Sequence, residues 1–429
     1  MKSCLHLQKS IYLAPKEIRA CCQRFFVNDE MKGDVVVMTP EPGEKVSYND
    51  IIKEKARLIA AINNGESEVC TGCPMLKDDD WPDVAVEQLQ TISIEDHSLC
   101  NMKCTYCSDD YYGGIPPSYD TLGLLNEIAT GRHHSPNLHI TWGGGEPTIR
   151  KDFGSLFQWV NENLSPQSQR VFSNALTYSR ELQTTIDRGK AYLTTSIDAG
   201  LEETFRLVRG NKGLNKVLRN LAKYSELRPD HVTIKYIFTE DNASLQNLTS
   251  FRNRILEFGL SDCDFLLSTD FKEEYPSEKT VTAIIELYIM LFDSGVKAIT
   301  LDEHVLQRVR DIGLSKISQA SPDSSQQQYD PPLSISLPII IWGSGSFAEF
   351  LISTSKKIKE KKLEIVAVVD ADKSRQGWEF FGHRILSPDE VHRLDGQIAI
   401  ASSNFYGKIL RDLISRGIDK NRVMPNFLL

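Results

Sequence analysis

The segment SLCNMKCTYCSDD, Ser98–Asp110, places three cysteines at positions 100, 104 and 107. This CxxxCxxC spacing allows one loop to wrap around a cubane iron–sulfur cluster. Three thiolates bind three irons, so the fourth iron stays open for a substrate or cofactor. A zinc site that recruits His97 as its fourth ligand is the alternative. Tyr106, next to the last cysteine, would shield the site.

A second motif, WGGGEPT, runs from Trp142 to Thr148 and follows an apolar segment that is typical of a strand. Its glycines permit close approach of a ligand to the backbone. Glu146 offers a carboxylate that can engage an ammonium group. The alternative is an ordinary glycine-rich turn.

Together the two motifs resemble the radical S-adenosylmethionine (radical SAM) superfamily, with Cys100–Cys107 as the cluster loop and Gly144–Pro147 as the GGEP strand end. The resemblance covers about Leu89 to Thr300. Three further segments match later parts of the same family, namely SNA at 173–175, SID at 196–198 and FRLVRG at 205–210.

The resemblance implies a partial (β/α)6 barrel in which S-adenosylmethionine binds the open iron of a 4Fe-4S cluster. Gly144, Gly145 and Glu146 would receive its methionyl end. Four side chains would contact its ribose or carboxylate, or else only cap nearby backbone: Ser173, Asn174, Ser196 and Asp198. The expected reaction is reductive cleavage of the cofactor and hydrogen abstraction from a substrate. A flavodoxin- or ferredoxin-type protein would supply the electron.

The pattern of apolar runs supports a parallel α/β fold. Short strand-like runs such as Leu89–Asp96 and Leu138–Gly144 alternate with helix-like stretches such as Phe153–Asn163. Both motifs follow such strands, and active groups collect at the carboxyl ends of parallel strands. No catalytic acid is assigned, because residues 109–112 (DDYY) are better read as a solvated turn.

The amino-terminal part holds a second set of cysteines, Cys4, the Cys21/Cys22 pair, Cys70 and Cys73. The order of these cysteines around a short strand and a helix resembles the twitch or SPASM auxiliary-cluster module. That resemblance implies a second, auxiliary 4Fe-4S cluster with four thiolates, in which Cys21 is favoured over Cys22. The alternatives are a structural zinc bound by the same thiolates and a role for Cys4 as a simple thiol.

After a linker at Ser318–Leu333, the run IIIWGSGSFAEFL carries a GxGxxA turn formed by Gly343, Gly345 and Ala348, and Asp370 ends the next strand. This signature predicts a Rossmann-like domain, with or without a bound nucleotide. If a nucleotide binds, Asp370 is expected to reach a ribose hydroxyl. The region resembles a nucleotide-sugar-associated domain of carbohydrate enzymes. The expected domains are therefore an auxiliary module (1–85), a barrel (86–317), a linker (318–333) and a Rossmann-like domain (334–429).

Composition narrows the function further. The chain has 429 residues and a formal charge of −9, which argues against nucleic-acid binding. No signal peptide or membrane-spanning run is apparent, so a cytoplasmic enzyme with a small-molecule or peptide substrate is expected. A saccharide or nucleotide-sugar is the first choice of substrate. A peptide-modifying maturase is the alternative, and a zinc-binding scaffold protein is the remote one.

Overall fold

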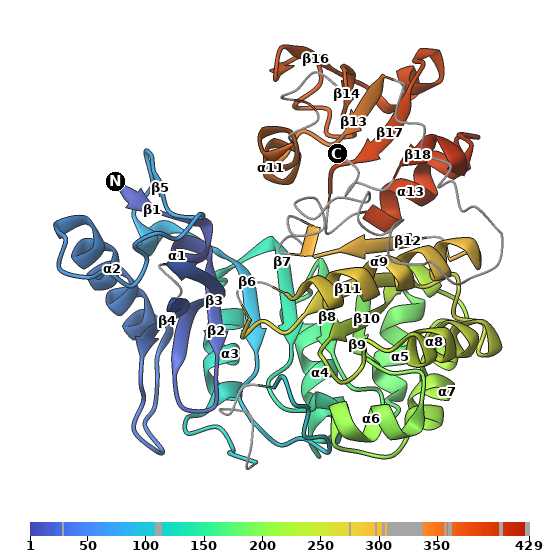
Figure 1. Cartoon of the computed structure of the whole chain (residues 1–429). Coiled ribbons are helices and arrows are strands. Elements are labelled where there is room, and N and C mark those ends of the chain that lie inside the picture. Colours follow the sequence, from blue (N-terminus) through green and yellow to red (C-terminus); the bar gives the residue numbers. More distant parts are fainter. Residues whose placement is uncertain are drawn as a thin grey trace. The chain divides into compact units, whose positions relative to one another are not determined.

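Figure 1 shows a computed structural model of the chain. It describes the residues 1–27, 30–107, 114–273, 276–296, 298–302, 305–306, 338–355, 358, 363–402 and 406–424. The turn at 109–112 and the linker at 318–333 lie outside these residues. The chain forms two compact units, of which unit 1 holds residues 1–234 and 270–274 and unit 2 holds the rest. The domain boundaries expected from the sequence stay predictions.

Four parallel strands form the centre of unit 1. They are β6 (Leu89–Ile94), β7 (His134–Trp142), β8 (Ser168–Phe172) and β9 (Ala191–Ser196). Ile94 pairs with Trp142, and Trp142 pairs with Val171, so the strands end at nearly the same level. Parallel neighbours need crossover connections, which here contain helices.

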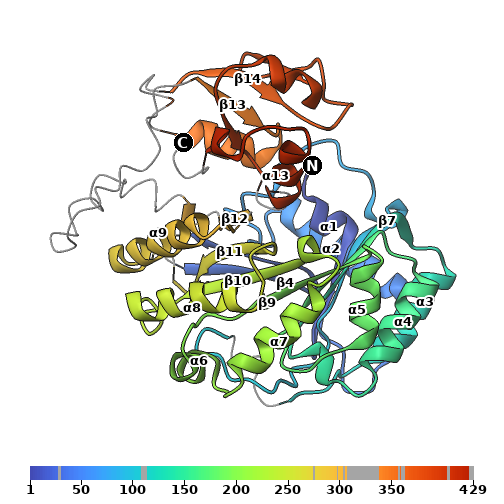
Figure 2. The same ribbon diagram turned by 90° about the vertical axis from the view of Figure 1, so that its right-hand side faces the viewer.

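Helices of unit 1 cover the outer side of these strands, and Figure 2 shows three of them, α3, α4 and α5, lying next to one another. Trp142 of β7 packs edge-on against Phe153 of α4 at 5.7 Å between ring centroids, and its ring also contacts Phe157. The bounds are α3 (Thr121–Thr130), α4 (Phe153–Asn163), α5 (Arg180–Asp187), α6 (Glu202–Arg209) and α7 (Leu214–Tyr224).

The amino-terminal residues extend the same sheet. Strand β2 (Ser10–Leu13) pairs parallel to β6, with Ile11 opposite Ile92. Strands β3 (Ile18–Val27) and β4 (Glu30–Met38) follow in antiparallel order, so the order in unit 1 is β9-β8-β7-β6-β2-β3-β4. In the structure these strands extend the central sheet, and the amino-terminal module expected from the sequence stays a prediction.

Short elements complete this region. A long helix, α2 (Tyr48–Asn64), follows β4, and a short helix, α1 (Leu5–Lys9), precedes β2. Ser47 caps α2 by accepting a hydrogen bond from the Asp50 amide, and Gly65 ends the helix in the left-handed conformation. The small elements are β1 (Lys2–Ser3), β5 (Lys77–Asp78), η1 (Val84–Val86), η3 (Pro147–Ile149) and η4 (Pro229–His231).

Unit 2 begins within β10 (Val232–Phe238) and holds the strand order β12-β11-β10, followed by a second sheet of order β15-β16-β14-β13-β17-β18. Asp264 of β11 forms an ion pair with Arg411 of α13 at 2.6 Å. The first sheet has α8 (Leu245–Glu257), β11 (Asp264–Thr269), α9 (Glu278–Asp293) and β12 (Ala298–Leu301).

The carboxyl-terminal sheet of unit 2 is built around buried β13, whose neighbours β14 and β17 are both parallel to it. Its elements are β13 (Ile339–Trp342), α11 (Ser346–Thr354), β14 (Ile365–Val369), β15 (Glu379–Phe380), β16 (His383–Leu386), η6 (Pro388–Arg393), β17 (Gln397–Ile400), α13 (Tyr406–Ser415), η7 (Lys420–Arg422) and β18 (Val423–Met424). The predicted α/β class with parallel sheets is therefore confirmed. Of the helices described, none is long and apolar enough to cross a bilayer.

Candidate functional site

The candidate residues predicted from the sequence lie in the loops that leave successive strands of unit 1. The cysteine loop follows β6, Glu146 follows β7, Ser173 and Asn174 follow β8, and Asp198 follows β9, whose last residue is the half-buried Ser196. Because these strands are parallel and in register, their carboxyl ends bring the loops to one edge of the sheet.

The cysteine loop is held against the glycine loop by backbone hydrogen bonds. The Gly145 amide donates to the His97 carbonyl at 2.8 Å, and the Glu146 amide donates to the Leu99 carbonyl at 2.7 Å. A Cβ atom on Gly145 would overlap the Leu99 backbone, so only glycine fits there. The second glycine of the motif, Gly144, adopts a φ of 86°, which also favours glycine.

A second segment holds the other side of the cysteine loop. The Lys103 amide donates to the Arg209 carbonyl at 3.1 Å, and the Thr105 amide donates to the Val208 carbonyl at 2.9 Å. Gly210, at a φ of 67°, lets this segment approach, because a Cβ there would lie 2.6 Å from the Lys103 carbonyl oxygen. The loop that carries the three cysteines is thus fixed from both sides.

Glu146 is 1% exposed, and its carboxylate joins the ends of β7 and β8. It accepts hydrogen bonds from the Ser173 hydroxyl at 2.7 Å, the Asn174 amide at 2.6 Å and the Thr148 hydroxyl at 2.6 Å. Burial raises the pKa of Glu146, and these donors oppose that shift. The sequence suggested that this carboxylate meets a ligand, but in the structure its oxygens are engaged by the protein itself.

Asp198 forms a buried triad with Tyr106 and Arg209. Its carboxylate accepts a hydrogen bond from the Tyr106 hydroxyl at 2.5 Å and lies 3.1 Å from Nη1 of Arg209, which also hydrogen-bonds the tyrosine hydroxyl. Asp198 itself is fully buried. The triad therefore anchors the residue between Cys104 and Cys107. The sequence singled out each member but did not reveal that they meet.

The three cysteines of the loop differ in exposure. Cys100 is exposed, Cys104 is buried and Cys107 is intermediate. The Asn174 side-chain amide lies 3.9 Å from the Cys100 sulfur and donates to the Asn101 side chain at 2.6 Å. Burial raises the pKa of Cys104, and the Arg209 guanidinium opposes that shift. A nearby cation of this kind favours the thiolate that metal ligation needs.

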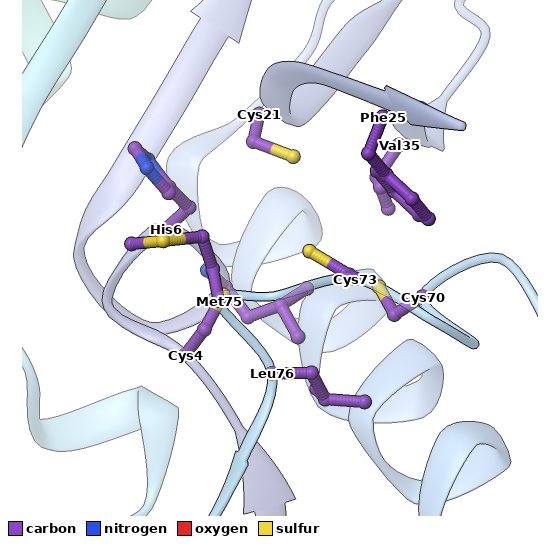
Figure 3. A pocket seen from close by; sticks show the side chains of 10 residues that line it. Cys4, His6, Cys21, Phe25, Val35, Cys70, Cys73, Met75 and Leu76 are labelled. Atoms are coloured by element: carbon purple, nitrogen blue, oxygen red, sulfur yellow. The ribbon is translucent and has the colours of Figure 1, made fainter. Parts of the chain in front are cut away.

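Four more cysteines meet in a pocket near the amino terminus, shown in Figure 3. We call it the cysteine pocket. Its lining residues are Cys4, His6, Leu7, Cys21, Phe25, Val35, Cys70, Cys73, Met75 and Leu76. The neighbouring Cys22 is not among them, because successive residues of a strand point to opposite faces.

Burial, together with the crowding of thiols, raises thiol pKa values in the cysteine pocket. Burial and negative charge on Cys21, Cys4 and Cys73 raise the pKa of Cys70 to about 12. Thiols that disfavour one another's ionisation in this way become thiolates only when a cationic centre compensates their charge. In the part of the chain that the structure describes, no three Cys, His, Asp or Glu side chains surround a point that suits a single metal ion. A cubane binds each thiolate at a separate iron.

The glycine-rich turn of unit 2 is closed by its own acid. The Ser344 amide and hydroxyl both donate to Asp370, at 2.8 Å and 2.5 Å, and the Asp372 amide donates to the other carboxylate oxygen at 2.9 Å. Gly343 adopts a φ of 114°. The acid expected to reach a ribose thus stabilises the turn between β13 and α11.

Comparison with known families assigns two regions. A model described as Radical SAM superfamily matches residues 94–249, which confirms the resemblance carried by the cluster loop and the GGEP strand end. A model described as C2185-like, N-terminal, matches residues 336–424. The twitch or SPASM module and the Rossmann-like assignment stay predictions.

Curated relatives match part of the chain only. A GTP 3',8-cyclase of Vibrio cholerae is 24% identical over 153 residues, which cover 35% of this chain and 45% of the relative. A GTP 3',8-cyclase of Vibrio atlanticus is 25% identical over 160 residues, which cover 37% and 48%. The chain thus matches less than half the length of each of these relatives.

Solved structures give distant matches. Streptococcus suis SuiB bound to S-adenosylmethionine is 13% identical, with 64% of this chain and 66% of that chain covered and a TM-score of 0.38. A radical SAM methyltransferase from Sphaerobacter thermophilus is 16% identical, with 49% and 64% covered and a TM-score of 0.36.

The Gly145→Ala variant should lose the metal of the cysteine loop, because the added Cβ would push the loop away from Leu99. We expect iron per chain after anaerobic reconstitution to fall by about four. Gly345→Ala is the matched control, since the nearest atom to its added Cβ is Nη1 of Arg375 at 3.7 Å. Wild-type iron in Gly145→Ala would contradict the tight docking of the two loops.

Proposed function

We propose that this chain is an enzyme of the radical SAM class, whose family model matches residues 94–249, and that Cys100, Cys104 and Cys107 hold a 4Fe-4S cluster that cleaves S-adenosylmethionine reductively. The supporting observation is the double docking of the cysteine loop, on Gly145 and Glu146 on one side and on Arg209 on the other. When bound, the cluster and cofactor supply a 5'-deoxyadenosyl radical, which removes a hydrogen atom from the substrate.

The residues around the loop would orient the cofactor. Gly144 and Gly145 bring backbone close to the open position without a side chain between. Glu146 holds Ser173 and the Asn174 amide in place, so its contribution to the binding of the methionyl end acts through these neighbours. Ser196 would contact the ribose or carboxylate, and Asp198 would position the loop through Tyr106.

Replacing Cys100, Cys104 and Cys107 together by alanine should abolish formation of 5'-deoxyadenosine, because the cluster loses all its protein ligands. The assay follows deoxyadenosine by chromatography after reduction with dithionite. Replacing Cys263, which belongs to neither cysteine set, by alanine is the control and should leave turnover intact. Turnover that survives the triple change would overturn the central proposal.

We further propose that Cys4, Cys21, Cys70 and Cys73 hold an auxiliary 4Fe-4S cluster. The supporting observation is their convergence in the cysteine pocket. Four thiolates leave no open iron, so this cluster would relay electrons, and a flavodoxin- or ferredoxin-type protein would reduce the enzyme. The apolar side chains of Leu7, Phe25 and Val35 would limit water near it.

The Cys70→Ser/Cys73→Ser double variant should retain about four of about eight irons and still form deoxyadenosine with dithionite, because only the auxiliary cluster is lost. Iron and sulfide analysis with EPR of the reduced protein checks this. Cys22→Ser is the matched control, since its side chain does not line the pocket. Zinc in place of iron at this site would contradict the redox role.

For the substrate, we propose a saccharide or nucleotide-sugar. Two observations favour a small, nucleotide-linked molecule over a peptide: the curated relatives are named for their action on GTP, and the match at residues 336–424 lies over the glycine-rich turn of β13 and α11. A phosphate at this turn would meet the amino terminus of α11. Asp370 would not contact it, because the Ser344 amide already donates to the Asp370 carboxylate.

Nucleotide-sugars should raise the thermal midpoint of the full chain, and a Gly343→Val variant should lose this response because the side chain is strained at a φ of 114° and meets the Ala401 carbonyl. The measurement is differential scanning fluorimetry with a panel of nucleotide-sugars. Gly417→Ala is the control for backbone strain alone, since Gly417 has a φ of 81° but open space around it and lies outside the turn. A response only to peptides would favour a peptide-modifying enzyme instead.

A further inference from the structure

Lys55 is a lysine on the buried face of α2. Its side chain has 0% exposure, and its ammonium donates to the carbonyls of Gln8 at 3.2 Å and Ser10 at 3.1 Å. These carbonyls lie where α1 ends and β2 begins. Helix α2 therefore places an ionisable amine in the interior, next to the end of α1 and the start of β2.

The local surroundings of Lys55 do not neutralise this charge. Among the described residues, no Asp or Glu lies within ion-pair distance of its ammonium. Burying a charge without a partner is costly, and carbonyl dipoles alone compensate it only in part. Burial accordingly lowers the pKa of Lys55 to about 7, whereas negative charge on Cys4 raises it.

The anion that Lys55 lacks would lie in the cysteine pocket. Cys4 begins α1, where its sulfur accepts a hydrogen bond from the Leu7 amide at 3.4 Å, and Gln8 ends the same helical turn. One helical turn beyond Lys55, Ile59 packs in the same apolar cluster as Cys4 and Cys70. Lys55 thus lies one turn from the residues of α2 that pack against Cys4 and Cys70.

We propose that Lys55 is the buried counter-ion of the cysteine pocket and sets the reduction potential of the centre held there. This inference rests on the proposed auxiliary cluster. A cluster with four thiolates carries net negative charge and becomes more negative on reduction, so a fixed cation nearby stabilises its reduced form. Lys55 acts as a positioning residue through charge and touches no substrate.

A purely structural role for Lys55 predicts a different effect of its replacement than a role as counter-ion does. If Lys55 only ties α2 to the carbonyls of Gln8 and Ser10, its loss should weaken the protein whether or not metal is present. If Lys55 is a counter-ion, replacing it by an apolar side chain removes an uncompensated buried charge from the metal-free protein. That change should be neutral or stabilising without metal and should affect the loaded centre only.

The experiment uses the full-length chain with Cys100, Cys104 and Cys107 changed to alanine, so that only the auxiliary cluster contributes. Lys55→Met is compared with Lys53→Met, an exposed lysine of the same helix that pairs with Asp50. Potentials are measured by EPR-monitored redox titration, and thermal midpoints are measured before and after reconstitution. Lys55→Arg, which keeps the charge, is the rescue variant.

In Lys55→Met we expect the ratio of reduced to oxidised cluster at a fixed potential to fall about tenfold, which is a shift of about 59 mV to lower potential for one electron. Lys53→Met and Lys55→Arg should stay near wild type, and metal-free Lys55→Met should melt no lower than its parent. An unchanged potential, or a metal-free protein that melts lower, overturns the inference. A parent without any reducible cluster overturns the proposed auxiliary site itself, and with it this inference.

Discussion

The close contact between the cysteine loop and the glycine loop is the constraint on which the site depends. Two amides of the glycine loop, those of Gly145 and Glu146, donate to carbonyls of the cysteine loop, and the space between the loops excludes a side chain at Gly145. This contact exists because β6 and β7 are parallel neighbours in which Ile94 pairs with Trp142. The register of two strands therefore determines where the three cysteines stand.

Buried charged side chains then hold residues of the site that the contact between the two loops does not hold. Asp198 and Arg209 are almost wholly inaccessible, and a buried pair contributes little net stability because both groups lose their hydration. The pair instead positions Tyr106, because the Tyr106 hydroxyl donates to a carboxylate that is held in place. Glu146 acts in the same way on the end of β8. Both acids thus hold the site through neighbouring residues, which a motif alone does not reveal.

The sequence predicted well the parts of this site that short motifs encode. It predicted poorly the contacts between residues that are far apart in the chain. The cysteine spacing and the GGGEPT run are local patterns whose chemistry requires those residues, so they predicted the cluster loop and the strand end. The alternation of apolar runs likewise predicted the strands and helices. The pairing of β2 with β6 joins segments about 80 residues apart and leaves no local signature. Lys55 was not foreseen either, because helical periodicity normally places lysine on the solvated face. The acid Asp370 was read as a ligand group, and only the structure revealed its bonds to Ser344.

The place of β2 bears on the auxiliary centre that we propose at the amino end of the chain. The Tyr12 hydroxyl of β2 donates to Glu95 at 2.6 Å, and the Gly144 amide donates to the same carboxylate oxygen at 2.9 Å. The helix that Cys4 begins runs directly into β2. The cysteine pocket and the glycine loop are therefore attached to one hydrogen-bonded pair of strands. Electron relay between the two proposed centres would need a fixed separation, and a parallel strand pair inside a continuous sheet provides one more firmly than a flexibly linked module would.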